Sequence, residues 1–309
     1  MDRRAALRRI GMTAGASWIA SLGGSGRAQP PAGQPIATRA IPSTGEAIPI
    51  IGLGTWQTFD AGGDAEARKP LEEVLEAFSA AGGRVIDSSP MYGSSEEVVG
   101  ELRTKTHAPP KPFIATKVWT TGKAAGIRQM EDSMRKLRVQ VMDLMQVHNL
   151  LDVDTHLATL DAWKKEGRVR YVGVTHYTAS GAEEVARLVA KRPVDFVQIN
   201  YSVAERDAEK RLLPLCREKG IAVIANRPFA GGELFRELRS RPLPSWAGEI
   251  DCASWAQLML KFVVSHPAMT CAIPASAKPE HTRDNMAAGL GRVPDAATRE
   301  RIAAAILRG

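Results

Sequence analysis

The sequence predicts an α/β protein folded as a (β/α)8 barrel, the TIM-barrel architecture, and three observations support this prediction. Short apolar runs rich in β-branched residues alternate eight times with amphipathic stretches, which is the pattern of parallel strands joined by helices. No G-x-G-x-x-G motif follows an early strand, which disfavours an open dinucleotide-binding sheet. The length of 309 residues suits one large barrel domain, because barrels of this kind often exceed about 250 residues.

Each element follows from its local pattern. We expect the first folded segment, residues 36–49, to form a hairpin that plugs the bottom of the barrel. The eight candidate strands span residues 48–56, 84–88, 113–118, 142–148, 169–175, 196–201, 221–226 and 270–274. Helices are expected at residues 67–81, 96–103, 126–137, 157–165, 182–191, 209–219 and 254–265, with extra C-terminal helices at 279–290 and 296–307.

Several of these boundaries carry helix-end signals. Ser94 and Glu97 have the spacing of a capping box at the start of a helix. Gly82, Gly83 and Gly220 stand where helices end just before strands. These signals support the predicted register of helices and strands.

Residues 1–28 have the features of an export signal. Arg3 and Arg4 precede an uncharged stretch, residues 10–22, that is too short to span a bilayer. The arginine pair and the mild hydrophobicity resemble twin-arginine signals, and Ala28 closes a small-x-small cleavage site. The alternative is a disordered basic tail or an amphipathic helix on a cytoplasmic protein.

These features divide the chain into three parts. We expect a twin-arginine signal peptide at 1–28, a linker and N-terminal hairpin at 29–47, and a barrel domain at 48–309. The protein is then expected to be exported to the periplasm by the twin-arginine machinery. No stable membrane anchor is predicted, because the apolar stretch is short and no cysteine follows the cleavage site.

Composition and charge exclude several other classes of protein. A hydrophobic content of 44% and a charged content of 24% are ordinary for a globular protein. Four of the seven net positive charges fall within residues 1–28, and no basic cluster follows, so no nucleic-acid partner is expected. Cys216, Cys252 and Cys271 lack metal-site spacing, so we predict no metal and interpret them as buried thiols.

Four polar residues stand at neighbouring strand ends, where a barrel of this kind carries its active site. Asp87 ends the second strand, Tyr92 lies in the loop after it, Lys117 ends the third strand and His148 ends the fourth. A lysine at the end of a buried strand requires a carboxylate partner, which Asp87 supplies. Taken singly, each residue also has an ordinary structural role as its alternative, such as capping, packing or snorkelling.

The motifs around these residues resemble those of the aldo-keto reductase family. The matching stretches are GLGTW at 52–56, VIDSSPMYGSSE at 85–96, ATKVW at 115–119, DLMQVH at 143–148 and VGVT at 172–175. The likeness extends from about residue 48 to residue 285 and implies reduction of aldehydes or ketones to alcohols by hydride from NADP(H). It implies that Tyr92 is the general acid, that Lys117 stabilises the phenolate, that Asp87 holds Lys117 and that His148 orients the carbonyl.

The same resemblance implies a set of cofactor-binding residues. Thr175, His176 and Gln198 would hold the nicotinamide amide, and Asn226 stands where the family has a stacking aromatic residue. The loop carrying Pro228, Phe229 and Gly231 would offer backbone N–H groups to the diphosphate. The adenosine end and its phosphate would contact Ser276, Lys278, Asp284 and Asn285, so that NADP(H) is the expected cofactor and NAD(H) the alternative.

The substrate is expected to be a small carbonyl compound. Trp56, Met91 and Trp119 would form an apolar wall beside Tyr92. One alternative is a cofactor-binding sensor or interaction subunit on the same fold with little turnover. Another is a metal-dependent hydrolase, which would need more His, Asp and Glu ligands at the strand ends than this sequence supplies.

Overall fold

The computed structural model describes residues 35–308. The predicted signal peptide and the first residues of the predicted linker lie outside this range. Two short strands, β1 (Thr38–Ala40) and β2 (Ala47–Pro49), pair antiparallel as the expected hairpin. The second hairpin strand therefore extends two residues past position 47.

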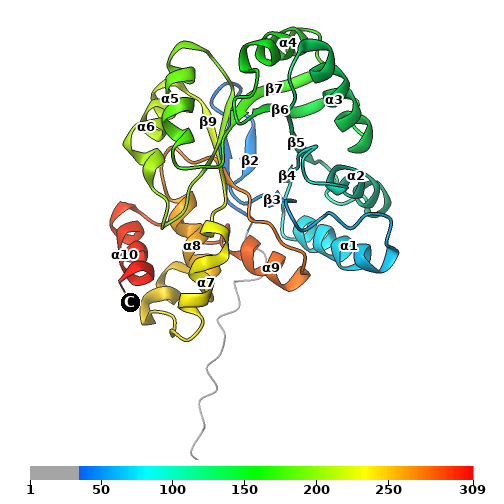
Figure 1. Cartoon of the computed structure of the whole chain (residues 1–309). Coiled ribbons are helices and arrows are strands. Elements are labelled where there is room, and N and C mark those ends of the chain that lie inside the picture. Colours follow the sequence, from blue (N-terminus) through cyan, green and yellow to red (C-terminus); the bar gives the residue numbers. More distant parts are fainter. Residues whose placement is uncertain (1–34, 309) are drawn as a thin grey trace, which may run out of the picture.

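Eight parallel strands follow and form the barrel wall (Figure 1). They are β3 (Leu53–Gly54), β4 (Val85–Asp87), β5 (Phe113–Val118), β6 (Met142–His148), β7 (Val169–Thr175), β8 (Phe196–Asn200), β9 (Ala222–Asn226) and β10 (Cys271–Ala272). Each strand pairs in parallel with its neighbour in chain order. The predicted (β/α)8 barrel is confirmed.

Backbone contacts join the first strand region to the last. The amide of Gly52 donates to the carbonyl of Ala272 at 2.8 Å, and the amide of Ala272 donates to the carbonyl of Ile50 at 2.9 Å. Isolated parallel bridges link Ile51 to Ala272 and Gly54 to Ala275. These contacts close the sheet into a barrel, which leaves no unpaired edge at this seam.

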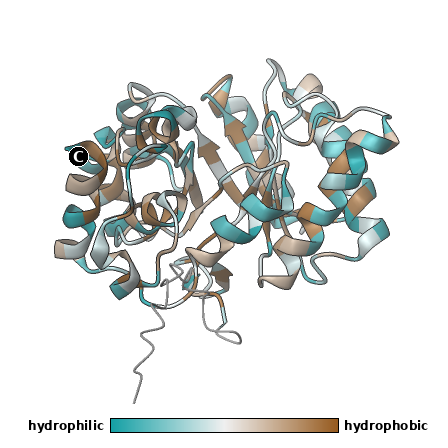
Figure 2. Ribbon diagram, turned by 90° about the horizontal axis from the view of Figure 1, so that it is seen from below, coloured by the Kyte–Doolittle hydropathy of each residue, from teal (hydrophilic) through white to brown (hydrophobic). Residues whose placement is uncertain are grey.

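Helices alternate with the strands and surround them. They are α1 (Ala65–Ala80), α2 (Ser95–Thr106), α3 (Lys123–Lys136), α4 (Val153–Lys165), α5 (Gly181–Lys191), α6 (Leu212–Lys219), α7 (Glu233–Leu238), α8 (Trp255–Val264), α9 (Pro279–Ala287) and α10 (Ala296–Leu307). Seen from below, the central strands carry mainly hydrophobic residues, and hydrophilic residues lie mostly on the surrounding helices (Figure 2). None of the helices within residues 35–308 has the length and apolarity needed to cross a membrane.

The bottom of the barrel is filled by aromatic side chains and by the hairpin. Phe113, Tyr171 and Phe196 lie with ring centroids 5.4–5.9 Å apart. Ile41 and Ile48 of the hairpin are fully buried in the same cluster. The hairpin therefore plugs the barrel as predicted, and the open end must lie at the opposite rim.

Several predicted elements begin or end a few residues from the observed bounds, α7 has no predicted counterpart, and two predicted elements are divided in the structure. The strand expected at 48–56 is divided, because residues up to Pro49 pair with β1 and Pro49 has no amide hydrogen to continue a ladder. The helix expected at 209–219 begins with a 3-10 turn, Asp207–Lys210, and breaks at Arg211, whose φ of −144° is not helical. The first and last residues of β5, β6 and β7 are those predicted.

The capping-box prediction for Ser94 is wrong. Ser94 makes no side-chain cap to α2, because its hydroxyl donates to Asp60 Oδ1 at 2.8 Å and accepts from the amide of Gly62. Gly82 and Gly220 do end helices in the left-handed conformation, with φ of +82° and +64°. The three cysteines are buried and free.

Candidate active site

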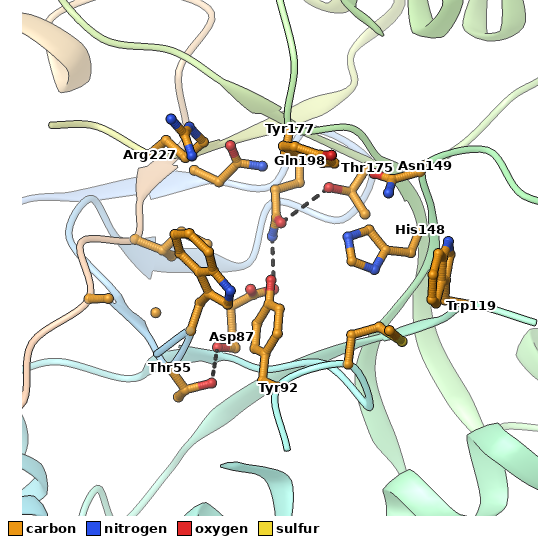
Figure 3. Close-up of a pocket in the computed structure, with 16 residues that line it drawn as sticks. Thr55, Asp87, Tyr92, Trp119, His148, Asn149, Thr175, Tyr177, Gln198 and Arg227 are labelled. Carbon is orange, nitrogen blue, oxygen red and sulfur yellow. Dashed lines mark hydrogen bonds between the residues drawn. The ribbon is translucent and has the colours of Figure 1, made fainter. Parts of the chain in front are cut away.

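A pocket opens at the carboxyl ends of the strands, opposite the hairpin, and encloses about 300 Å³ (Figure 3). Its lining combines predicted site residues with others. The residues that line it are Gly54, Thr55, Trp56, Asp87, Met91, Tyr92, Trp119, His148, Asn149, Thr175, Tyr177, Gln198, Asn226, Arg227, Ile273 and Ala275. Three of the four predicted catalytic residues are among them, and the fourth, Lys117, is hydrogen-bonded to Asp87.

Lys117 and Asp87 form a buried ion pair at the floor of the pocket. Lys117 Nζ donates to Asp87 Oδ2 at 2.6 Å and to the carbonyl of Ser88 at 2.7 Å, and the two side chains are 1% and 3% exposed. Gln146 and Gln198 donate their amides to Asp87 Oδ1. Burial by itself would lower the pKa of Lys117, but the negative charge of Asp87 and the phenol of Tyr92 outweigh it, so the pKa of Lys117 is raised.

Tyr92 is held above this ion pair by a braced loop. Lys117 Nζ lies 5.2 Å from the centroid of the Tyr92 ring. Next to Tyr92, Gly93 has a φ of +59°, and the adjoining amide of Ser94 donates to Asp60 Oδ1 at 2.8 Å. A Cβ atom on Gly93 would lie 2.3 Å from Asp60 Oδ2, and the positive φ also favours glycine, so a side chain here would strain the turn and displace the Asp60 carboxylate.

The pKa of Tyr92 is set by two opposing effects. Burial raises the pKa of the phenol, while the positive charge of Lys117 acts to lower it. The net shift is upward. Tyr92 is therefore a protonated phenol at neutral pH, with a cation beside it that stabilises the phenolate after proton loss.

His148 is a neutral imidazole at the wall of the pocket. Burial, followed by the charges of Lys117 and His176, lowers the pKa of His148 to about 3. Its Nδ1 atom is buried and has no hydrogen-bond partner among the described residues. The ring of Trp119 lies beside it, with centroids 6.3 Å apart. A neutral ring offers one N–H donor and one acceptor to a bound molecule.

A buried carboxyl group lies behind the strand that carries Lys117. Glu96 of α2 is 2% exposed and accepts hydrogen bonds from the hydroxyls of Thr116 and Ser133. Burial raises the pKa of Glu96. Because Thr116 precedes Lys117 on β5, Glu96 braces the end of this strand from the helix side.

Two of the three residues predicted to hold the nicotinamide amide, Thr175 and Gln198, line the pocket together with Asn226, which stands at the position of the family's stacking aromatic residue. Thr175 donates to Gln198 Oε1 at 3.2 Å, and Asn226 Nδ2 donates to the carbonyl of His176 at 3.1 Å, which leaves Asn226 Oδ1 buried without a partner among the described residues. An orphaned acceptor of this kind fits an amide N–H of a bound group.

His176 is not among the residues that line the pocket. Its Nδ1 atom accepts from the backbone amides of Tyr177 and Thr178, at 3.1 and 3.3 Å. Gly181 leaves room for the ring, since a Cβ there would lie 2.0 Å from His176 Nδ1. The observed contacts of His176 thus organise its own loop, and its contact with a cofactor stays a prediction.

The predicted diphosphate and adenosine residues lie outside the pocket lining. Pro228 and Gly231 belong to the loop after β9, and the ring of Phe229 contacts that of Phe235 with centroids 4.9 Å apart. Ser276 donates to the carbonyl of Lys278. Asp284 accepts from Ser254 and Gln257 of the α8 region, and Asn285 is buried. These partners fix the two segments, and the cofactor roles of their residues stay predictions.

The three residues predicted to form a substrate wall lie in one pocket, and their contact with a substrate stays a prediction. Trp56, Met91 and Trp119 line the pocket while remaining 44%, 45% and 37% exposed. Large apolar side chains at the mouth of a pocket with a few polar groups at its floor suit a small organic ligand. Among residues 35–308, no group of His, Cys, Asp and Glu is placed to hold a metal ion.

Six of the lining residues have no role in the sequence-based prediction. They are Gly54, Thr55, Tyr177, Arg227, Ile273 and Ala275. All of them except Gly54 directly adjoin a predicted strand end or site residue, and this adjacency is the signal that could have found them. Asn149, which directly follows His148, is expected from the sequence to make the substrate wall more polar and open. Asn149 and Arg227 also adopt positive φ, of 52° and 49°, which no local motif indicates.

Comparison with known proteins gives a consistent result. The Aldo/keto reductase family matches residues 50–302 of the chain. Methylglyoxal reductase YeaE of Escherichia coli (strain K12) is 30% identical over 247 residues, which cover 78% of this chain and 85% of that protein. A solved aldo/keto reductase from Klebsiella pneumoniae in complex with NADP and acetate is 28% identical, with a TM-score of 0.68, and covers 84% of this chain and 91% of its own. Another from Klebsiella pneumoniae, in complex with NADPH, is 26% identical, with a TM-score of 0.70 and coverage of 87% and 94%.

Proposed function

Because the chain belongs to the aldo/keto reductase family, we propose that it reduces an aldehyde or ketone to an alcohol, with Tyr92 as the general acid. The chain is an NAD(P)H-dependent oxidoreductase, and the bound nicotinamide nucleotide supplies the hydride. One observation carries the assignment of Tyr92. Its ring faces the ammonium group of Lys117, which Asp87 holds in place at the floor of the pocket.

Tyr92 gives its proton to the carbonyl oxygen. Since burial raises its pKa, the phenol carries that proton at neutral pH. The phenolate formed by the transfer is stabilised by Lys117, whose own charge is maintained by Asp87. The ion pair thus offsets part of the cost of placing a negative charge in a buried site.

His148 orients the carbonyl group. The low pKa, about 3, keeps its ring neutral, so one ring N–H is available to donate a hydrogen bond to the carbonyl oxygen. A neutral donor is suited to this role because it does not compete with Tyr92 as the acid. Trp56, Met91 and Trp119 exclude water from the apolar part of the substrate.

The side of the pocket formed by the ends of β7, β8 and β9 offers polar groups that suit a nicotinamide group. Gln198 and Asn226 would hold its amide, since Asn226 Oδ1 has no partner among the described residues. We expect NADP(H) to be preferred over NAD(H), because two similar structures hold NADP or NADPH and because Lys278 adjoins the predicted phosphate site. Titration with each nucleotide, followed by protein fluorescence, tests this preference.

The test of the proposed function is the Tyr92→Phe variant. Removing the proton donor is expected to slow carbonyl reduction by a factor of about 100 to 10,000, with NADPH affinity unchanged. Tyr171→Phe is the control, because it removes a hydroxyl at the opposite end of the barrel. Turnover by Tyr92→Phe at the wild-type rate would overturn the role of Tyr92. Tight NADPH binding by the wild type without reduction of any carbonyl compound would favour the sensor function instead.

Export is proposed on the sequence of the first 28 residues alone. Arg3 and Arg4 support a twin-arginine route to the periplasm. Cell fractionation of the full chain and of the Arg3→Lys/Arg4→Lys double variant tests it. We expect the wild type in the periplasmic fraction and the variant in the cytoplasm.

A further inference from the structure

One charged side chain in the pocket has no part in the mechanism above. Arg227 follows directly after β9 and lines the pocket. Figure 3 places it on the side opposite His148 and Trp119, with Gln198 between. It therefore faces the same space as Tyr92 from another wall.

Arg227 carries the one charge in the pocket lining that no opposite charge within the described residues balances. Only Asp87 and Arg227 are charged among the residues that line the pocket, since the pKa of about 3 leaves His148 neutral. Asp87 is neutralised by Lys117 at 2.6 Å. A molecule in this pocket consequently meets a net positive charge, located at Arg227.

Arg227 has no acidic partner in the part of the chain that the structure describes. None of the ion pairs formed within residues 35–308 includes it. Its Nε atom is buried and has no hydrogen-bond partner among the same residues. Buried guanidinium N–H groups are ordinarily satisfied, most strongly by carboxylate or phosphate oxygens.

The backbone around Arg227 is shaped to keep the guanidinium in place. Arg227 itself has a φ of +49°, an uncommon conformation for a residue with a side chain, and its carbonyl accepts from the amide of Ala230 at 2.9 Å. Gly231 lies beneath the side chain, because a Cβ built there would be 3.2 Å from Arg227 Nη2. The loop thus folds back and leaves room for a planar, two-pronged donor at the pocket wall.

We propose that Arg227 binds an anionic oxygen group, a carboxylate or a phosphate, of a molecule held in the pocket. This inference rests on the proposed function, which brings two such molecules there. The anion belongs either to a carbonyl substrate that carries a carboxylate or to the diphosphate of the nicotinamide nucleotide. A guanidinium recognises both groups through paired N–H donors.

The experiment uses the full chain with Arg227→Gln, which removes the charge, and Arg227→Lys, which keeps it without the planar fork. Arg239→Gln is the matched control, because Arg239 is an exposed arginine at the end of α7, outside the pocket. NADPH affinity is measured by protein fluorescence. Affinity for para-carboxybenzaldehyde and for its methyl ester is measured by calorimetry in the presence of NADP⁺, so that no turnover is needed, and KM and kcat are measured separately with NADPH.

A carboxylate-bearing substrate is the source if Arg227→Gln weakens binding of para-carboxybenzaldehyde by about tenfold or more and leaves the ester and NADPH unchanged. The diphosphate is the source if NADPH binding weakens by a similar factor and both aldehydes are affected equally. In either case Arg227→Lys should restore part of the loss. The proposal is overturned if Arg227→Gln changes none of these affinities, or if Arg239→Gln changes them to the same extent.

Failure of the proposed function gives a different result. If the wild type binds NADPH but reduces neither aldehyde, the reductase function fails while the two affinity measurements still decide the role of Arg227. If the wild type reduces both aldehydes and Arg227→Gln is indistinguishable from it in every affinity, the reductase function stands and the inference about Arg227 fails.

Discussion

The Nζ atom of Lys117 lies 2.6 Å from Oδ2 of Asp87, and the two side chains are 1% and 3% exposed. Both charges are therefore almost fully removed from water. Such a pair contributes little to stability as a unit, because desolvation opposes the attraction, but removing one partner leaves the other charged and buried. This asymmetry gives the first prediction.

Lys117→Met and Asp87→Asn are each expected to destabilise the protein by about 3–5 kcal/mol, because each leaves one buried charge unpaired. The double variant should be less destabilised than the sum of the two. Urea unfolding measures all three. Lys105→Gln, which breaks an exposed pair with Glu72, is the control and should cost about 0–1 kcal/mol. Equal small effects at both pairs would contradict the burial of the Lys117 charge.

The pH dependence of stability should report His148. Its folded-state pKa is about 3, below the usual histidine pKa of 6.5, chiefly because the ring is buried. A depressed pKa contributes stability that is fully present above pH 6.5 and lost as the pH falls through 3. His148→Gln should therefore show a shallower loss of stability in acid than the wild type, measured by unfolding midpoints across that range.

The same shift predicts the pH–rate profile. With His148 neutral and Tyr92 protonated, kcat/KM for carbonyl reduction should be flat between about pH 5 and pH 8. Measurement of kcat/KM across this range checks it. An inflection near the ordinary histidine pKa that disappears in His148→Gln would show that the ring titrates there and would contradict the expectation.

Glu96 should affect the pH dependence of stability in the direction opposite to His148. Burial raises its folded-state pKa above the usual glutamate pKa of 4.5, so its contribution to stability is present below pH 4.5 and lost as the pH rises through the folded-state pKa. Glu96→Gln cannot ionise and should be relatively more stable at neutral pH than in acid, when compared with the wild type. Glu97→Gln, the same change at the next and exposed position, should show no such pH dependence. Thermal unfolding at several pH values distinguishes them.

Gly93→Ala should disturb the position of Tyr92. The added methyl would lie 2.3 Å from Asp60 Oδ2, so either the loop moves or the Asp60 carboxylate shifts and its hydrogen bonds to Ser94 are disturbed. We expect kcat to fall by about tenfold or more, since small displacements of a catalytic group are costly. Gly62→Ala is a matched control, because Gly62 also has a positive φ, +53°, but nothing lies within 4 Å of the added atom. Equal kcat in the two variants would mean that backbone strain, and not the contact with Asp60, is responsible for any loss.

The sequence predicted those parts of the fold that local patterns control. The bounds of β5, β6 and β7 are correct because each strand is a mostly buried run of six or seven residues that begins with an apolar residue and contains neither proline nor a turn signal. Ser94 failed as a cap because Asp60, far away in the sequence, competes for its hydroxyl. Long-range competition of this kind has no local signature.

The candidate site was predictable to a similar degree. Asp87, Lys117 and His148 were found because parallel strands in a barrel bring their carboxyl ends to one rim. The sequence did not place Arg227 in the pocket. The position of its side chain depends on the left-handed backbone of Arg227 and on the absence of a side chain at Gly231. Neither condition follows from residue type alone.

The seam that closes the barrel has a consequence for how the protein is made. Ile50 and Gly54 leave the ribosome early, but their partners Ala272 and Ala275 are among the last parts of the barrel to be synthesised. Gly54 and Ala275 both line the pocket, so its wall is incomplete until this late pairing forms. Pairings so distant in sequence are slow to form. We therefore expect a nascent chain to bind no nucleotide, and cofactor capture to follow release from the ribosome.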